Sequence, residues 1–512
     1  MTRRIRYLAA AFGVLYLLVF VQLNRIQFFG AERLREDPVN TRGLVREFGR
    51  RRGAIVTADG VVAARSVPAP NTGGEFRREY PTGDLYAHLT GYQSLTVGAV
   101  GLERAFDDEL AGRVVTQRFR SLRDLLVDRD ATATVVMTVD DEVQRAARDA
   151  LGERRGSVVA LDPRTGAVLA SWTWPSFDPG PLASPDGATA NAAYEALLDD
   201  PDDPLLAKAF REVFFPGSTF KLVTASAGLA SGRVGPHTPV FPETDRYEPL
   251  PSGSPIRNFG GATCGGDLFE ILRVSCNTAF AEMGAEWIGP ADMIATAQAY
   301  GFGTAPPFDV PGAVASRFPT DYGAPLATVA DYRAGPGEVL VNGDVPVFEN
   351  SARLAQAAIG QNDVAATPLQ MALVAAAIAH GGEIMAPHVV AELRGADGTV
   401  YRRTEPRAWR RAVSAPVAAT LREAMIGVVE GGTARRLAIE GLEVGGKTGT
   451  AQLGTDPPRS HAWIVAFAGP PGGEPEIAVA VIVEGQQGAS EQTGGRVAAP
   501  VARAVIEAAL EP

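Results

Sequence analysis

The chain has 512 residues, of which 46% are hydrophobic and 21% are charged. A chain of this length folds into more than one domain, and this composition excludes wholesale disorder. The formal net charge of −11 argues against a general electrostatic role on nucleic acid, and two cysteines are too few for a zinc cluster or a disulfide-rich scaffold.

The first predicted element is an apolar helix at the amino terminus. Residues 7–23 carry no charge, and as a helix they would extend about 25 Å, at the short end of a membrane span. Three arginines precede this run, which predicts a cytoplasmic amino terminus. The alternative is a cleaved signal peptide, but large residues follow where a small-residue cleavage site is expected. We therefore expect a single-pass protein of the cell membrane, with its remaining residues outside the cytoplasm.

The next elements predict an α+β fold. Residues 26–135 read as an irregular β-rich module, with a hairpin over 51–66 that turns at Asp59-Gly60. A helix over 140–151 and two strands at 156–162 and 167–174 follow, and then a loop over 175–204. Helices are predicted at 367–380 and 500–510, and buried strands at 461–469 and 476–485. Hairpin-connected strands with interspersed helices favour α+β over alternating βαβ units. The expected parts are a cytoplasmic tip and anchor (1–25), a β-rich module (26–135) and an α+β domain (136–512).

Lysine is rare in this chain. Only Lys208, Lys221 and Lys447 occur among 48 basic residues. Lysine, unlike arginine, loses its proton when it is buried, so each of the three is a candidate for chemistry.

The first motif is Ser218-x-x-Lys221, at the start of an apolar helical pattern. One helical turn separates the two residues, so they share a face. A desolvated, neutral lysine there could remove the serine proton. The plain alternative is a capped helix with a solvated lysine.

Two further motifs carry polar groups. Ser275-Cys276-Asn277 reads as a short loop between helical stretches, in which Ser275 could relay a proton and Asn277 could bind a substrate amide. Residues 444–452 (VGGKTGTAQ) read as an edge strand, with Gly449 allowing a close backbone approach. Helix capping and a glycine-rich hairpin are the plain alternatives.

The two cysteines, Cys264 and Cys276, are twelve residues apart. Outside the cytoplasm a disulfide is possible, and closing so short a loop would stabilise the fold by roughly 3 kcal/mol. The alternative is two buried free thiols.

Together the motifs S-x-x-K, S-x-N and K-T-G, with two of the three lysines at their lysine positions, resemble those of a class B penicillin-binding protein. Residues 51–60 (RRGAIVTADG) resemble an amino-terminal signature of that family, although its first Asp is missing here. Residues 80–92, 101–112 and 431–434 resemble further family segments. The arginine-rich composition, and the expected absence of a glycosyltransferase domain and of a carboxy-terminal extension, are similar to the actinobacterial penicillin-binding protein A group.

The resemblance implies a peptidoglycan D,D-transpeptidase in cell-wall synthesis during growth or division, inhibited by β-lactams. Ser218 would be the nucleophile, Lys221 its base and Ser275 a proton relay. Asn277 would hold the substrate backbone, and Lys447, Thr448, Gly449 and Thr450 would bind the terminal carboxylate, with N–H groups of Ser218 and Thr450 as the oxyanion hole. The fold implied is an antiparallel sheet flanked by helices.

The same resemblance also implies substrates and partners, and it leaves alternative functions open. The substrates would be stem peptides ending in D-Ala-D-Ala. The implied partners are a membrane-embedded glycan polymerase and other division or elongation proteins. Neither cofactor nor metal is expected, since the five histidines contain no H-E-x-x-H pair. The alternatives are a D,D-carboxypeptidase or β-lactamase of the same fold, and a non-catalytic penicillin-binding sensor or scaffold.

Overall fold

The computed structural model describes residues 2–29, 48–69, 75–114, 130–455, 459–485 and 492–510. Helix α1 (Thr2–Phe29) contains the predicted apolar segment. Its window Arg3–Gln22 has a mean hydropathy of 1.8, and none of it is buried. The helix is long and apolar enough to cross a membrane, a property that it shares with signal sequences. The junction between this helix and the next module falls at 30–47, outside the described residues.

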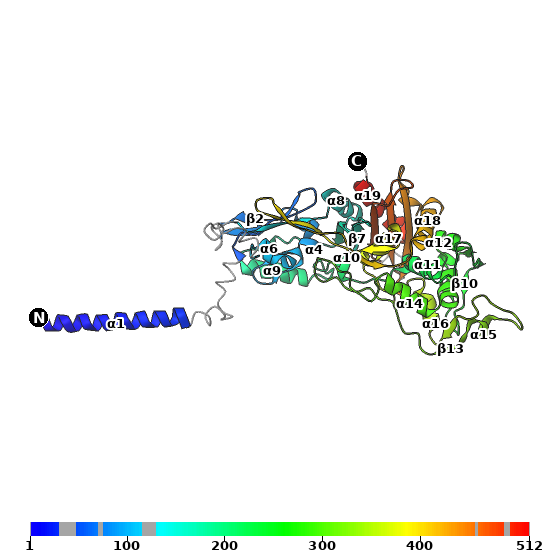
Figure 1. Cartoon of the computed structure of the whole chain (residues 1–512), viewed down its shortest axis with the longest axis horizontal. Helices are drawn as coiled ribbons and strands as arrows, with labels where there is room; N and C mark the ends of the chain where they lie inside the picture. The colour runs from blue at the N-terminus through cyan, green and yellow to red at the C-terminus, as the bar shows by residue number, and fades with distance from the viewer. Residues whose placement is uncertain are drawn as a thin grey trace.

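A six-stranded sheet forms the core of the amino-terminal module (Figure 1). Its order is β17-β16-β6-β1-β2-β3, and only β1 and β6 are parallel neighbours. Four strands come from the module, namely β1 (Ile55–Val56), β2 (Val62–Pro68), β3 (Phe76–Glu79) and β6 (Ala133–Met137). The other two, β16 (Val390–Gly395) and β17 (Val400–Arg403), come from far along the chain. The module and the catalytic domain are therefore joined by a shared sheet.

The module also contains short helices and a buried charge cluster. The smaller elements are η1 (Gly83–Tyr86), α4 (Ala87–Thr90), β4 (Gln93–Ser94), β5 (Gly98–Ala99), α5 (Gly101–Ala105) and α6 (Asp107–Leu110). Glu103 is fully buried and accepts hydrogen bonds from Arg52 at 3.0 Å and Arg78 at 2.5 Å. A buried carboxylate needs such partners, so this cluster fixes α5 against the sheet.

A five-stranded antiparallel sheet forms the core of the catalytic domain. Its order is β19 (Glu443–Gln452), β20 (Ser460–Gly469), β21 (Ile477–Val483), β7 (Gly156–Leu161) and β8 (Val168–Trp174). Helices α8 (Asp141–Leu151) and α19 (Ala499–Leu510) pack together on one face, and α17 (Pro368–Ala379) and α18 (Ala415–Gly431) contact the sheet from the other. Because helices cover both faces of the sheet, the side chains of β20 and β21 are almost wholly apolar. Strand β19 lies at one edge of the sheet.

The remaining elements surround this sheet. They are η3 (Pro181–Ala183), α9 (Gly187–Leu198), α10 (Lys208–Arg211), η4 (Gly217–Phe220), α11 (Lys221–Ala230), β9 (Phe241–Thr244), β10 (Arg246–Tyr247), β11 (Ile256–Arg257), η5 (Phe259–Gly261), β12 (Cys264–Gly266), α12 (Leu268–Arg273), α13 (Asn277–Glu282), η6 (Met283–Ile288), α14 (Pro290–Ala299), β13 (Pro325–Thr328), α15 (Val329–Arg333), β14 (Pro346–Phe348), α16 (Ser351–Ala357), β15 (Glu383–Met385), β18 (Ala408–Arg411), η7 (Arg435–Leu437) and η8 (Gly494–Ala498).

Most predicted elements are confirmed, but one prediction is wrong. The hairpin over 51–66, the helices at 140–151, 367–380 and 500–510, and the four sheet strands occur as expected. The stretch 175–204, predicted as a loop, contains helix α9. The side chain of Asp186 caps this helix by accepting from the amides of Ala188 and Thr189. Only Ala190 of the helix is buried, so the apolar periodicity that identifies a helix is weak there.

Candidate active site

The nucleophile candidate lies on a tight helical turn. Gly217 has a φ of 53° and donates its N–H to Gly360 at 3.0 Å, which ends the preceding extended segment. Ser218 then lies in η4, a 3₁₀ turn, and Lys221 begins α11. Side chains three residues apart eclipse one another in a 3₁₀ turn, so Ser218 and Lys221 lie on one side of it. The prediction placed Ser218 at the start of an α-helix, and the structure replaces that first turn with the 3₁₀ turn.

Lys221 is fully buried and reaches the second motif. Its Nζ lies 2.7 Å from Ser275 O, 2.7 Å from Asn277 Oδ1 and 3.3 Å from Ser275 Oγ. Lys447 Nζ lies 2.7 Å from the same Ser275 Oγ. The structure therefore brings both motif lysines to one hydroxyl.

The donors and acceptors of this cluster balance if one lysine is neutral. A neutral Lys221 donates its two protons to Ser275 O and Asn277 Oδ1 and keeps one lone pair. The Ser275 hydroxyl can donate into that lone pair while it accepts from Lys447. An ammonium at both lysines would direct two donors at Ser275 Oγ and leave its proton without an acceptor among these three residues.

Burial favours the same protonation pattern. It lowers the pKa of Lys221 well below the ordinary lysine value, and the nearby positive charge of Lys447 lowers it further. Burial also lowers the pKa of Lys447, to about 7. Desolvation, which the sequence analysis required of Lys221, is the larger cause, and repulsion by Lys447 is the smaller one.

Ser275 lies in the predicted loop between α12 and α13, and Asn277 is the first residue of α13. Ser275 has a φ of 63°, a left-handed conformation that a serine adopts only when its surroundings enforce it. Asn277 donates from Nδ2 to Arg257 O at 3.1 Å, which fixes the amide so that Oδ1 faces Lys221.

Asn258 supports this loop and was missed by the sequence reasoning. It is buried, and its Oδ1 accepts from the amides of Asn277 at 2.9 Å and Thr278 at 3.0 Å. It thereby satisfies the amino-terminal amides of α13 from its position between β11 and η5. No local pattern marks this residue, because its partners are about 20 residues away.

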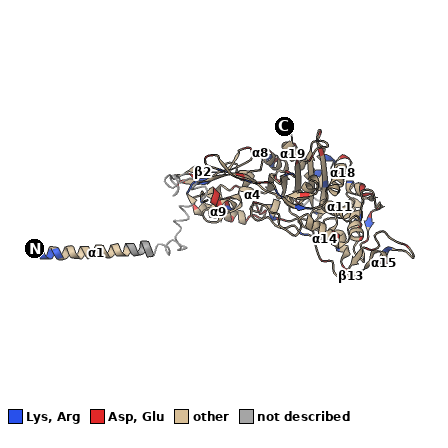
Figure 2. Cartoon of the chain, in the orientation of Figure 1, with Lys and Arg blue, Asp and Glu red and all other residues tan. Residues whose placement is uncertain are grey.

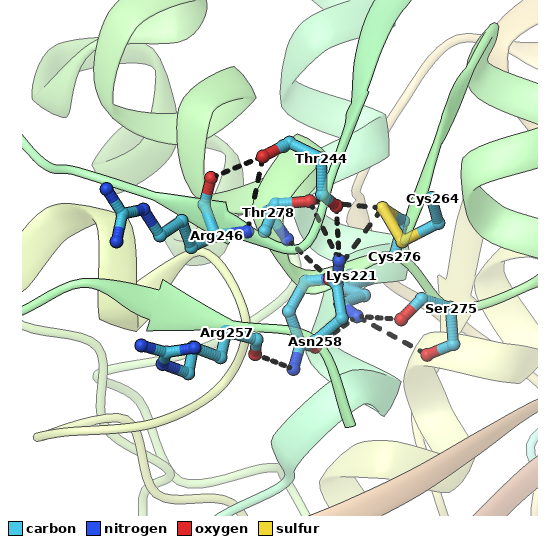
Figure 3. Close-up of a disulfide and its surroundings, with 10 residues drawn as sticks. Lys221, Thr244, Arg246, Arg257, Asn258, Cys264, Ser275, Cys276 and Thr278 are labelled. Carbon is cyan, nitrogen blue, oxygen red and sulfur yellow. Dashed lines mark hydrogen bonds between the residues drawn. A yellow bond between two sulfur atoms is a disulfide. The ribbon is translucent and has the colours of Figure 1, made fainter. Parts of the chain in front are cut away.

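Cys264 and Cys276 form a disulfide, with their Cα atoms 5.9 Å apart. Figure 3 shows the bridge beside Ser275 and Asn258. Because Cys276 is the central residue of the S-x-N motif, the bridge ties that motif directly to β12.

The third motif lies on the edge strand β19, as predicted. Thr448, Thr450 and Gln452 alternate along the strand and line one cleft. A Cβ on Gly449 would come within 2.9 Å of Pro216 O and 2.9 Å of Trp463 Cβ. Glycine at this position is what lets β19 approach the turn that carries Ser218.

The cleft has a volume of about 1380 Å³. Ser218, Ser275, Asn277, Thr448 and Thr450 all line it, so all three motifs meet there. A residue that the sequence reasoning left without a role, Thr433, also lines the cleft, and its Oγ1 lies 2.6 Å from Thr448 Oγ1. Thr433 lies in the 431–434 segment that carried part of the family resemblance.

The third lysine lies elsewhere. Lys208 is buried and pairs with Glu484 at 2.8 Å. His461 accepts from the amide of Gly485 at 3.1 Å, and burial lowers its pKa to about 4. Among the described residues, no group of three or more His, Cys, Asp or Glu side chains could hold a metal ion.

Comparison with known families agrees with this geometry. Residues 156–507 match the penicillin binding protein transpeptidase domain, and residues 52–136 match the penicillin binding protein A dimerisation domain. The chain therefore belongs to the penicillin-binding protein transpeptidase family, within its class B.

Individual relatives match over the whole chain. The chain is 42% identical to the peptidoglycan D,D-transpeptidase PbpA of Mycolicibacterium smegmatis, over 100% of this chain and 99% of the relative. It is 39% identical to PbpA of Mycobacterium tuberculosis at the same coverage. Its structure is similar to penicillin-binding protein A from M. tuberculosis in a ceftriaxone acyl-enzyme complex. The TM-score is 0.78 with 36% identity, over 91% of this chain and 99% of the other.

Proposed function

We propose that this protein is a peptidoglycan D,D-transpeptidase that cross-links stem peptides through an acyl-enzyme on Ser218. The observation that carries the proposal is the meeting of the three motifs in one cleft, with both lysines on Ser275 Oγ. The PbpA relatives are peptidoglycan D,D-transpeptidases, and similar structures are β-lactam acyl-enzyme complexes, which supports the same reaction here.

Acylation starts at the Ser218 hydroxyl. The Ser275 hydroxyl turns its proton away from Lys221, and the freed lone pair of neutral Lys221 takes the Ser218 hydroxyl proton as Ser218 Oγ attacks the carbonyl between the two terminal D-alanines. The N–H groups of Ser218 and Thr450 stabilise the oxyanion, a contribution of about 3 kcal/mol for each donor. The carbon–nitrogen bond then breaks, and the proton passes through Ser275 to the departing D-alanine. What remains is an ester on Ser218.

The substrate is held from two sides of the cleft. Asn277 binds the peptide backbone, and Thr448 and Thr450 bind the terminal carboxylate in the positive potential of Lys447. An amine of a neighbouring stem peptide attacks the ester carbonyl, forms the cross-link and releases Ser218. A β-lactam acylates the same oxygen, but its cleaved ring stays attached.

The chain organisation suits an enzyme anchored beside its substrate. We assign 1–25 to the anchor, 26–135 to a pedestal module and 136–512 to the transpeptidase domain. The matched segment 52–136 covers most of the proposed module, and the matched segment 156–507 lies within the proposed transpeptidase domain. Figure 2 has basic residues at the start of α1 and an uncharged stretch after them, which favours a cytoplasmic amino terminus in the cell membrane. A membrane-embedded glycan polymerase and other division or elongation proteins are the proposed partners.

Intact-mass measurement with benzylpenicillin tests the nucleophile. We expect a stoichiometric adduct on the wild-type protein and none on Ser218→Ala. Ser231→Ala, a matched change at the end of α11, should keep the adduct. An adduct on Ser218→Ala would refute the assignment.

A second assay separates the transpeptidase from its hydrolase rivals. With a D-Ala-D-Ala peptide and an acceptor amine, we expect the cross-linked product and slow loss of the penicilloyl adduct. Rapid turnover of penicillin, or hydrolysis with no cross-linked product, would favour a β-lactamase or a D,D-carboxypeptidase.

A further inference from the structure

One wall of the cleft carries a cation and an aromatic ring that the proposed reaction does not use. Along residues 256–259 the side chains alternate, with Ile256 and Asn258 buried and Arg257 and Phe259 exposed. Arg257 and Phe259 both line the cleft. Arg257 ends strand β11 and Phe259 begins the 3₁₀ turn η5, so the guanidinium and the ring come from adjacent elements of one cleft wall. The phenyl group is 59% exposed, which is unusual for so large an apolar side chain.

This wall is adjacent to the residue proposed to hold the substrate backbone. The carbonyl of Arg257 accepts from Asn277 Nδ2 at 3.1 Å, and Asn277 Oδ1 in turn accepts from Lys221. A stem peptide whose backbone binds Asn277 therefore runs past Arg257. The carboxylate of its terminal D-alanine lies at the opposite wall, on Thr448 and Thr450.

The positive charge of Arg257 is not used locally. Within the part of the chain that the structure describes, its guanidinium has no carboxylate partner. Arg246 lies directly opposite on β10 and pairs with Glu248 at 3.3 Å. Figure 3 shows both arginine side chains extending from the strand pair in the same direction. Like charges at opposed positions destabilise a strand pair, so the fold itself gains nothing from Arg257.

The acidic residues of the cleft leave this charge available. Glu243 and Glu270 also line the cleft. Glu270 is occupied by Arg273 at 2.7 Å. A ligand carboxylate that reaches Arg257 therefore finds a guanidinium that no described carboxylate has neutralised.

We infer that Arg257 and Phe259 form a subsite for the stem-peptide residue that precedes the two D-alanines, and that it favours an aliphatic side chain ending in a carboxylate. This inference rests on the proposed function. The ring of Phe259 covers the methylenes, and the planar guanidinium binds the carboxylate through two parallel hydrogen bonds. A neutral carboxamide at the same position loses the charge-assisted pair.

Two peptides that differ in one group test the subsite. Each is a pentapeptide ending in D-Ala-D-Ala, with a diaminopimelate third residue whose side-chain terminus is either a carboxylate or its carboxamide. The measured quantity is kcat/KM for D-alanine release by the full-length protein. We expect the wild-type protein to favour the carboxylate about tenfold, as a partly exposed charge-assisted pair allows.

The variants assign that preference to residues. Arg257→Gln should reduce it to about twofold or less, chiefly through KM of the carboxylate peptide. Arg246→Gln is the matched control, because it removes one positive charge from the same strand pair but Arg246 does not line the cleft. This variant should keep the wild-type preference for the carboxylate peptide. Phe259→Ser should raise KM for both peptides equally, since both contain the methylenes.

The outcomes distinguish this inference from the proposed function. A wild-type protein that releases no D-alanine and forms no penicilloyl adduct would contradict the proposed function. A reactive wild-type protein with equal kcat/KM for the two peptides would overturn only the subsite. The subsite would also be overturned if Arg257→Gln kept the wild-type ratio of kcat/KM between the two peptides. It would be overturned as well if Arg246→Gln lowered that ratio as much as Arg257→Gln does.

Discussion

The contact between β19 and the turn that carries Ser218 can be tested with a single methyl group. In Gly449→Ala the new Cβ would lie 2.9 Å from Pro216 O, 2.9 Å from Trp463 Cβ and 3.0 Å from Thr219 Cγ2. These atoms belong to backbone or to the root of a side chain, so none of them can swing away. The strand and the turn must separate by about half an ångström to restore van der Waals contact.

This separation should affect chemistry more than stability. Overpacking at such a site costs about 1–3 kcal/mol, and each kcal/mol lowers Tm by about 1–2 °C in a domain of this size. The two proposed oxyanion donors lie on the two segments that move apart. Displacing one donor should therefore lower the acylation rate constant by about 100-fold.

The assay is the second-order rate constant for acylation by a fluorescent penicillin, measured together with thermal unfolding. Gly427→Ala is the matched control, because a Cβ there meets nothing within 4 Å and the residue lies inside helix α18. It should keep the wild-type acylation rate and a Tm at least as high. If Gly449→Ala acylates within twofold of wild type, the argument from close contact is wrong.

Two further predictions concern groups around the cleft and behind its sheet. Lys208→Met breaks a buried ion pair with Glu484 and should lower the free energy of unfolding by about 3–5 kcal/mol while penicillin acylation at 25 °C continues; loss of acylation in a folded variant would give Lys208 a role in chemistry. Replacing Cys264 and Cys276 together by serine should lower the free energy of unfolding in urea by roughly 3 kcal/mol, since their bridge constrains the unfolded chain; an unchanged unfolding midpoint would contradict this.

Local patterns in the sequence predicted much of the fold and the motif residues. The apolar runs of β20 and β21 and the capped start of α17 are local signals, and the structure has these elements where they were expected. Helix α9 was not predicted, because most of its side chains are exposed and it therefore has no clear apolar periodicity.

Pairing between strands that are far apart in the chain could not be predicted from local sequence patterns. Val135 of β6 pairs with Leu393 of β16, and no local pattern connects two strands so far apart in the chain. Asn258 was missed for the same reason. The family resemblance that the S-x-x-K and K-T-G motifs carry implied that both lysines share one site. The deep burial that lowers their pKa values depends on packing that only the folded chain supplies.

The central claim is that a neutral, buried Lys221 activates Ser218. The neutral amine of Lys221 is the active form, so the acylation rate constant should rise with pH through the pKa of Lys221. It should fall again as Lys447, whose pKa burial lowers to about 7, loses the charge that attracts the carboxylate. Because burial lowers that pKa, the rise should be complete well below the ordinary lysine value of 10.5.

The most direct measurement is therefore the penicillin acylation rate constant from pH 5 to pH 10 for wild type and Lys221→Arg, with circular dichroism to verify folding. We predict an acid limb far below pH 10 in the wild type, and a folded Lys221→Arg protein that acylates about 1000-fold more slowly. A wild-type limb near 10.5, or an arginine variant as fast as wild type, would contradict the account.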